Sequence, residues 1–376
     1  MIQTISRPPN DDFTFSIFSE LLSQLTHEFE AYYIWSYPDD QLFNFLSTTQ
    51  FSKPNVIIGI KDLLNSGKAY DYWRDSAQVG TGYLDLMASK HTNKNFIIFT
   101  SLENVELEKI TSTNLQFVHW GGDITNQADL YPGVSSVLDK NFNSDKTFIS
   151  LNRGPRTHRL ILLSYLFGAG YNTSGYLTFL GQEKFSLPNC IFDMLSWPFE
   201  NKTKITIQDG YKKFYNNPDL SIIQYELIYP TPNNNVDNFT HRLAPLYRNS
   251  FVELVTEPSF TPPSFLLTEK TLNSIYGCNF PIILSGAGTI QHLRNIGFDM
   301  FDDIVDHGYD QIANPADRII LAIENNKQLL VDSEHVKKLW RDNQYRFENN
   351  VRLASTKLYQ WFRGRAVAQF REIKLV

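Results

Sequence analysis

The chain has 376 residues and a formal net charge of −6, with 42% hydrophobic and 20% charged residues. This composition is that of a globular protein, and the length favours two domains over one. The acidic balance argues against a protein whose whole surface binds nucleic acid, although it leaves room for a local basic groove. Two cysteines, Cys190 and Cys278, provide neither a disulfide framework nor a cysteine-based metal cluster.

The N-terminal residues contain no apolar signal core, and no apolar run approaches the roughly 20 residues of a membrane span. We therefore expect a cytoplasmic protein without a membrane span.

The first part of the chain, residues 1–143, predicts an α/β domain. Apolar side chains recur every three to four positions over residues 13–31, which indicates an amphipathic helix. Short apolar runs follow and predict strands over residues 31–35, 56–60, 96–100 and 115–120. Their alternation with polar or helical stretches is typical of an open α/β sheet.

The segment His119-Trp120-Gly121-Gly122-Asp123 follows the last of these strands. The two glycines allow a close approach of backbone and substrate. Asp123 is the candidate for the base that takes a proton from an acceptor hydroxyl. The alternative is a glycine turn in which Asp123 caps local backbone.

A polar segment over residues 141–146 predicts a linker, after which residues 147–151 predict a strand. Arg153, Arg156 and Arg159 come next, at the start of a helix closed by Gly168 and Gly170. Their spacing of three would place them on one face of a helical turn. Positive charge opposes the dipole at a helix N-terminus, so it favours a bound anion there, and guanidinium groups bind phosphate. The alternative is a solvated basic helix start.

Residues 250–288 predict a strand, a helix, a second strand and a second helix in succession. Such a parallel α/β unit binds ligands at the carboxyl ends of its strands. At that edge we expect Glu257, Glu269, Lys270, Gly286 and Gly288. A helix N-terminus beside an ammonium group favours phosphate, and a carboxylate can accept the hydroxyls of a ribose. The alternative is that Glu269 and Lys270 are ordinary residues of a first helical turn.

Three segments resemble, in this order, the donor-binding half of fucosyltransferase-like and exostosin-like glycosyltransferases. They are Phe265-Leu-Leu-Thr-Glu-Lys-Thr271, Pro281-Ile-Ile-Leu284 and Asn295-Ile-Gly-Phe298. The resemblance extends from Thr147 onward. It implies that Glu269 holds the ribose and Lys270 the phosphate of a sugar nucleotide.

The expected architecture is the glycosyltransferase B arrangement, in which two Rossmann-like lobes face each other across a cleft. Residues 1–143 would form the acceptor-binding lobe and residues 144–335 the lobe that binds the nucleotide sugar. Residues 336–376 are predicted to form helices that cross back to the first lobe.

The expected reaction moves a sugar from a nucleoside diphosphate sugar to a hydroxyl of a glycan, a small molecule or modified DNA. The two aspartates Asp302 and Asp303 are adjacent, whereas the metal-binding Asp-x-Asp motif has one residue between its aspartates. We therefore expect Arg153, Arg156, Arg159 and Lys270 to neutralise the diphosphate, without a metal or cofactor. Two alternatives stay open. One is a phage-type DNA glycosyltransferase that acts on hydroxymethylated pyrimidines, and the other is a non-catalytic nucleotide-binding protein of the same fold.

Overall fold

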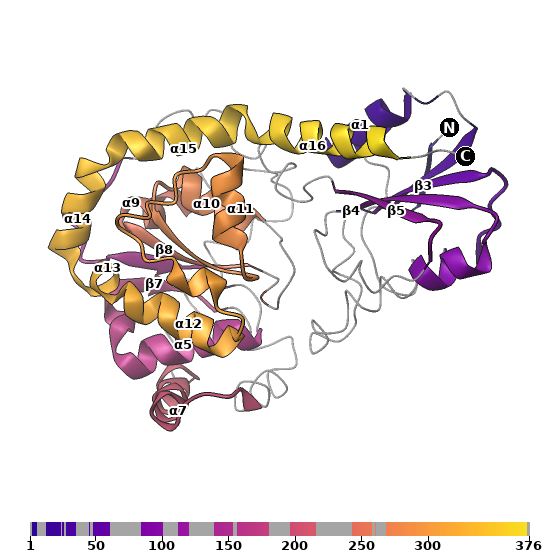
Figure 1. Ribbon diagram of the computed structural model, residues 1–376. Coiled ribbons are helices and arrows are strands. Elements are labelled where there is room, and N and C mark those ends of the chain that lie inside the picture. Colours follow the sequence, from indigo (N-terminus) through magenta and orange to yellow (C-terminus); the bar gives the residue numbers. More distant parts are fainter. Residues whose placement is uncertain are drawn as a thin grey trace, which may run out of the picture. The chain divides into compact units, whose positions relative to one another are not determined.

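The computed structural model describes residues 2–5, 13–23, 25, 28–34, 45, 48–60, 84–100, 112–119, 139–152, 156–179, 196–215, 243–257, 260 and 268–373. The chain divides into two compact units (Figure 1). Unit 1 takes Met1–Asp129, Pro263–Thr268 and Lys357–Val376, and unit 2 takes Leu130–Pro262 and Glu269–Thr356. Each unit is an α/β structure around a parallel sheet.

The strands are β1 (Ile2–Ile5), β2 (Phe29–Ile34), β3 (Asn55–Ile60), β4 (Asn95–Thr100), β5 (Leu115–His119), β6 (Phe148–Ser150), β7 (Gly175–Leu177), β8 (Val252–Thr256) and β9 (Phe280–Leu284). The helices are α1 (Phe13–Ser23), α5 (Thr157–Ala169), α7 (Asn201–Tyr215), α9 (Ala244–Arg248), α10 (Glu269–Tyr276), α11 (Thr289–Ile296), α12 (Pro315–Asn325), α13 (Lys327–Val331), α14 (Ser333–Asp342), α15 (Gln344–Thr356) and α16 (Leu358–Glu372). Short 3₁₀ helices occupy Tyr171–Ser174 (η3) and Gly308–Gln311 (η5).

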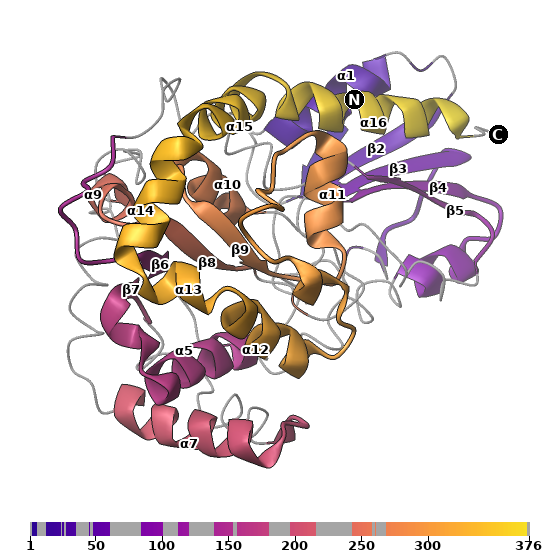
Figure 2. The same ribbon diagram turned by 60° about the vertical axis from the view of Figure 1, so that its left-hand side comes forward.

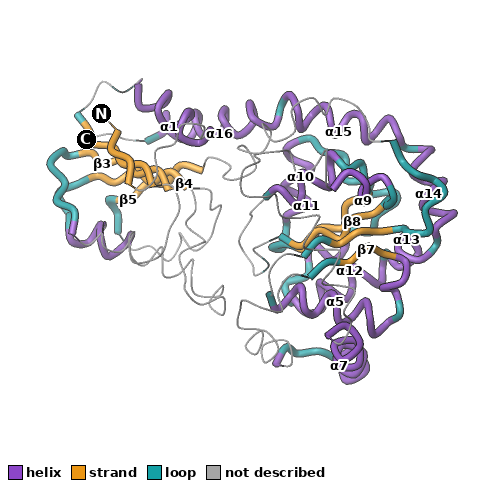
Figure 3. Tube along the Cα trace, turned by 180° about the vertical axis from the view of Figure 1, so that it is seen from behind, coloured by secondary structure: helices purple, strands orange, loops and turns teal. Residues whose placement is uncertain are grey.

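The described strands of unit 1 form a parallel sheet of five, in the order β1-β2-β3-β4-β5. One face carries Tyr33, Ile57 and Phe99, and α1 and α16 cover it with side chains such as Phe18 and Phe370. Figure 3 shows these two helices side by side above the strands. Because α16 comes from the end of the chain, the core of unit 1 is completed by residues far from its sheet in sequence.

The opposite face of the same sheet carries a cluster of aromatic rings. Phe51 lies edge-on to Tyr32 and to Phe96, with ring centroids 5.8 and 5.2 Å apart. Leu84 and Met87 are also buried; they lie in the same unit, on a short helix over residues 84–90. Burial on both faces explains why β3 and β4 read as continuous apolar runs rather than alternating ones.

The described strands of unit 2 form a parallel sheet in the order β7-β6-β8-β9. Helices α5 and α12 cover one face of it and α10 and α11 the other (Figures 1 and 2). The chain leaves β6 toward β7 on one side and later enters β8 on the other side of β6. The strand order therefore reverses between β6 and β8, which makes this point a topological switch point.

Helix α5 is buried around its whole circumference, since every residue from His158 to Phe167 is buried and most of them are apolar. The sheet covers one side, and α7 packs along the outer side (Figure 2). The two helices approach closely at small residues: a Cβ atom added to Gly210 would lie 1.7 Å from the carbonyl oxygen of Ser164. A helix that is apolar all round is stable only when it is covered in this way.

At the amino end of the unit 2 sheet, the ammonium group of Lys140 is enclosed by oxygen atoms. It donates hydrogen bonds of 2.7 Å to the carbonyl oxygens of Tyr247, Ser250 and Gly277, and another to Oδ1 of Asn279. Burial lowers the pKa of Lys140 to about 7. The contacts tie the ends of α9 and α10 to the segment that precedes β6.

Glu253 on β8 lies next to this cluster and is 2% exposed. Its Oε1 accepts a hydrogen bond of 2.8 Å from the hydroxyl of Tyr247. Burial raises the pKa of Glu253 to about 8, against the opposing effect of Lys140.

The helices after residue 332 divide between the two units. Helices α14 and α15 pack on unit 2, where Nε1 of Trp340 donates to the carbonyl oxygen of Cys278 at 2.7 Å and Phe347 packs against Phe301 at 4.5 Å between centroids. Helix α16 packs on unit 1, and Gln369 accepts a hydrogen bond of 2.8 Å from the backbone N–H of His119. The main divisions between the units thus lie near residues 129 and 356, and the domain boundaries expected near residues 143 and 335 stay a prediction.

The predicted mixed α/β class with parallel sheets is confirmed. The helix expected over residues 13–31 ends at Ser23, because Phe29, Glu30 and Ala31 pair with β3. Over the part of the chain that the structure describes, no helix has the length and apolar character needed to cross a membrane.

Candidate functional site

The predicted site residues that the structure describes gather at the carboxyl ends of β6, β8 and β9 in unit 2. Three side-chain contacts link the end of β8 to the end of β6 and to the start of α5. Thr256 donates from Oγ1 to Oδ1 of Asn152 at 2.8 Å, Arg159 donates from Nη2 to the carbonyl oxygen of Thr256 at 3.1 Å, and His158 Nε2 lies 3.1 Å from the carbonyl oxygen of Glu257. The topological switch point is therefore lined by polar and charged groups from both strands.

The predicted arginines occupy this switch point in different ways. Arg156 is the N-cap residue of α5 with an extended backbone (φ −142°, ψ 146°), so the helix begins only at Thr157. Arg159 lies in the first turn and is 3% exposed. Arg153 lies outside the described residues. The spacing of three therefore does not place these arginines on one helical face, since Arg156 precedes the helix.

Between the two arginines in sequence, His158 is 6% exposed and stacks on Phe260, with ring centroids 4.9 Å apart and planes inclined by 12°. Burial and the charges of Arg159 and Arg156 hold the pKa of His158 well below its usual value, so the ring is neutral at pH 7. Because the partner of Nε2 is a carbonyl oxygen, Nε2 carries the hydrogen and Nδ1 is the acceptor. The ring therefore adds no charge of its own beside the two guanidinium groups.

Glu257, directly after β8, is 0% exposed. Its Oε1 accepts hydrogen bonds from the backbone N–H of Thr271 at 3.3 Å and from the hydroxyl of the same residue at 2.5 Å. Glu257 thus satisfies a free amide in the first turn of α10, the part of a helix that favours negative charge. Of the two acidic residues expected to hold the ribose, this one serves α10, while the side chain of Glu269 lies outside the described residues.

Lys270 is half-buried in the first turn of α10. The turn Gly286-Ala287-Gly288 follows β9 and leads into α11, as expected. Gly288 has φ 87°, a backbone conformation that favours glycine.

The N-terminus of α11 holds a carboxylate from the chain itself. Asp310 is 2% exposed, and its Oδ2 accepts a hydrogen bond of 3.2 Å from the backbone N–H of Ile290. Its carbonyl oxygen accepts another of 3.0 Å from Gly288. Burial raises the pKa of Asp310, against the lowering effect of the backbone N–H groups of Ile290 and Gln291 and of Arg318. Of the two helix starts expected to attract phosphate, the α11 start is therefore paired with a carboxyl group of the chain itself, whereas arginines lie at the α5 start.

Arg318 in α12 is a residue of this edge that the sequence did not single out. Its guanidinium group is 1% exposed and lies 5.0 Å from the centre of the Phe260 ring. Nη1 donates to the carbonyl oxygens of Phe260 at 3.1 Å and Ser285 at 2.5 Å, and Nε donates to that of Ile312 at 2.9 Å. Burial lowers the pKa of Arg318 to about 10, so it stays charged at pH 7. Arg318 joins the loops that follow β8, β9 and η5.

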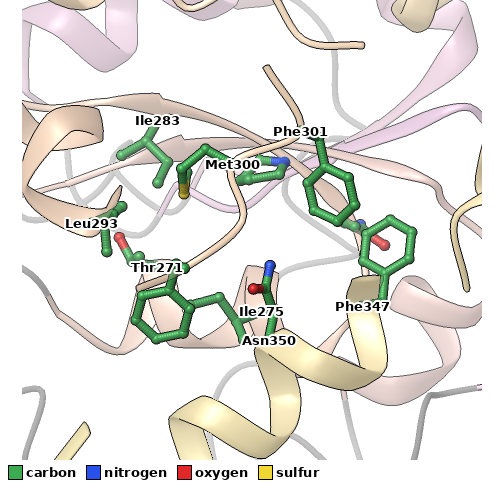
Figure 4. Close-up of a pocket in the computed structure, with 11 residues that line it drawn as sticks. Thr271, Ile275, Ile283, Leu293, Met300, Phe301, Phe347 and Asn350 are labelled. Atoms are coloured by element: carbon green, nitrogen blue, oxygen red, sulfur yellow. The ribbon is translucent and has the colours of Figure 1, made fainter. Parts of the chain in front are cut away.

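Unit 2 also has two hollows. One is a cavity between α10, β9 and α15, lined by Thr271 and by apolar side chains such as Ile275, Met300 and Phe347 (Figure 4). Its volume is about 10 Å³. This volume admits at most one water molecule. A larger surface hollow of about 490 Å³ includes Arg294 and Asp302, which form an ion pair with each other.

His119 ends β5 in unit 1, while Trp120, Gly121, Gly122 and Asp123 lie outside the described residues, so the role of Asp123 stays a prediction. Within the described ranges, no group of three or more His, Cys, Asp or Glu side chains is arranged to hold a metal ion.

No model of a known protein family matches the sequence, and comparison with curated proteins finds no significant similarity. The resemblance to fucosyltransferase-like and exostosin-like enzymes therefore remains a prediction from the three sequence segments.

Proposed function

We propose that the protein is a glycosyltransferase that moves a sugar from a nucleoside diphosphate sugar to an acceptor hydroxyl. The observation that supports it best is the convergence of Arg156, Arg159 and the end of β8 at the topological switch point of unit 2. Open α/β sheets bind their ligands at such a point. Arg156 and Arg159 provide the positive charge that a diphosphate requires.

In this proposal the bond between the anomeric carbon and the diphosphate oxygen breaks, and a bond between that carbon and the acceptor oxygen forms. The hydroxyl proton passes to a base, for which Asp123 is the candidate, and the nucleoside diphosphate leaves. The arginines and Lys270 stabilise the negative charge that develops on the leaving diphosphate, which is the main electrostatic task of the reaction. The two units would form the donor-binding and acceptor-binding lobes of the glycosyltransferase B arrangement.

The proposal is tested first by binding. Arg156→Ala should weaken the binding of a nucleoside diphosphate about 10- to 150-fold, because a charge-assisted hydrogen bond contributes roughly 1.5–3 kcal/mol. Isothermal titration calorimetry against adenosine, guanosine, cytidine and uridine diphosphates measures this change. Arg352→Ala is the control, since Arg352 is an exposed arginine of unit 2 that donates to Asn349 on α15. Equal affinities in the parent and in Arg156→Ala would place the site elsewhere.

A second test concerns the base. Once a donor is identified, Asp123→Asn should lower turnover by about 10²- to 10⁴-fold, the contribution of general-base catalysis, and leave donor affinity within twofold. Unchanged turnover would assign Asp123 to turn structure. An equal loss of affinity and of turnover would place Asp123 on the donor side.

A further inference from the structure

A row of aromatic rings extends from the arginine-bearing start of α5. His158 stacks on Phe260 at 4.9 Å, and Phe260 stacks on Trp197 with centroids 6.3 Å apart and planes inclined by 14°. Trp197 in turn lies 6.3 Å from Phe199, at 29°. His158 and Phe260 are buried, whereas Trp197 and Phe199 are half-buried. The row thus begins among the cationic groups of the switch point and ends in a partly exposed indole.

The ring spacing shows that Trp197 is only partly covered by its neighbours. Parallel rings in contact lie about 3.5–4 Å apart face to face, so a centroid distance of 6.3 Å requires a sideways offset of about 5 Å. At such an offset, Phe260 and Phe199 each overlap only the margin of the indole. The indole is half-buried, so part of its surface is exposed.

The position of Trp197 indicates which part of a donor nucleotide would contact it. Two stacking steps, of 4.9 and 6.3 Å between ring centroids, separate His158 from Trp197. In the proposed reaction the sugar must reach an acceptor held by unit 1, which leaves the base of the donor to unit 2. Trp197, Phe260 and His158 all belong to unit 2.

We infer that Trp197 is the stacking platform for the nucleobase of a nucleoside diphosphate whose phosphates bind at Arg156. This inference rests on the proposed function and adds the site for the base. Stacking on an aromatic side chain tolerates every base, so the platform supplies affinity for the nucleoside rather than a choice among bases.

Calorimetry with nucleoside diphosphates and with inorganic pyrophosphate tests the inference. The parent should bind at least one nucleoside diphosphate about 5- to 150-fold more tightly than pyrophosphate, the factor that base stacking provides. Trp197→Ala should remove most of this difference and leave the affinity for pyrophosphate within twofold. Trp197→Phe should keep part of the difference, because the smaller ring still stacks. Melting temperatures of both variants show whether the fold is intact, and Trp197→Phe replaces Trp197→Ala if the latter does not fold.

Each alternative outcome has a separate meaning. Parent-like affinity of Trp197→Ala for the nucleoside diphosphate, with a loss in Arg156→Ala, overturns the base platform and leaves the proposed function standing. A parallel loss of affinity for the nucleoside diphosphate and for pyrophosphate in Trp197→Ala also overturns it, because Trp197 would then support the site structurally. A parent that binds neither ligand contradicts the proposed function itself.

Discussion

At the scale of single residues, Glu253 makes the stability of unit 2 depend on pH. Its pKa of about 8 in the folded protein lies above its ordinary value of 4.5, so the folded state binds its proton more tightly than the unfolded state does. The neutral carboxyl group therefore contributes stability that is fully present below pH 4.5. That contribution is lost as the pH rises through about 8.

Glu253→Gln removes this dependence, because the amide cannot ionise. The free energy of unfolding of the variant, relative to the parent, should rise between pH 4.5 and 7 by up to about 1.4 kcal/mol per pH unit. Well below its folded pKa of about 7, Lys140 is protonated in both states and adds little slope of its own; close to pH 7 its titration adds a slope of the opposite sign to that of Glu253. Urea titrations at several pH values measure the difference. Glu372→Gln, at an exposed position of α16, is the control, and a constant difference between Glu253→Gln and the parent would contradict the prediction.

The site residues show which features a sequence reveals. Glu257 directly follows β8, and Arg156 and Arg159 lie at the start of α5, the helix that follows β6. Parallel strands end at one edge of their sheet, so the proximity of these residues could be predicted. Arg318 reaches the same edge from α12, and Asp310 reaches the start of α11 from η5. Both placements depend on tertiary packing that local patterns do not contain.

At the scale of secondary-structure elements, the close crossing of α5 and α7 depends on Gly210. An added Cβ atom would meet the backbone of Ser164 and Gly168 rather than a flexible side chain. Gly210→Ala should therefore destabilise unit 2 by about 1–3 kcal/mol, the typical cost of overpacking. Thermal and urea unfolding measure this loss.

Gly364→Ala is the matched control in α16, because no atom lies within 4 Å of the added Cβ. There the substitution should stabilise the helix by about 0.5–1 kcal/mol, since alanine favours helices over glycine. Stabilisation by both substitutions would show that α5 and α7 are not in close contact.

Some of the strands and helices could be predicted from the sequence, and others could not. The strands β3, β4, β6, β8 and β9 were predicted from their apolar, often β-branched runs. Helix α7 was not predicted, because Gly210 interrupts it and only Ile207 and Phe214 are deeply buried. Its stability comes from packing on α5, which overrides a weak local preference.

At the scale of the whole molecule, unit 1 depends on the end of the chain. Helix α16 contributes Ala366 and Phe370 to its core, and Arg363 forms an ion pair with Glu20. Removing all residues after Thr356 should therefore unfold unit 1. Loss of a buried phenylalanine alone costs about 3–5 kcal/mol, a large part of the 5–15 kcal/mol that stabilises a typical domain.

Hydrogen exchange followed by mass spectrometry measures this effect in each unit. The strands β2 to β5 should lose protection in the shortened chain, while β6, β8 and β9 keep it. A chain that lacks only residues 374–376 is the control. Full protection of β2 to β5 without α16 would show that unit 1 is stable by itself.

The shared position of both ends of the chain in unit 1 also sets an order of events on the ribosome. The roughly 240 residues between Asp129 and Phe370 take on the order of tens of seconds to translate at about 5–20 residues per second. During this interval the apolar face formed by Tyr33, Ile57 and Phe99 lacks the helix that later covers it. Unit 2 can fold as soon as Thr356 has left the exit tunnel. The strands of unit 1 are therefore synthesised before unit 2 and completed after it.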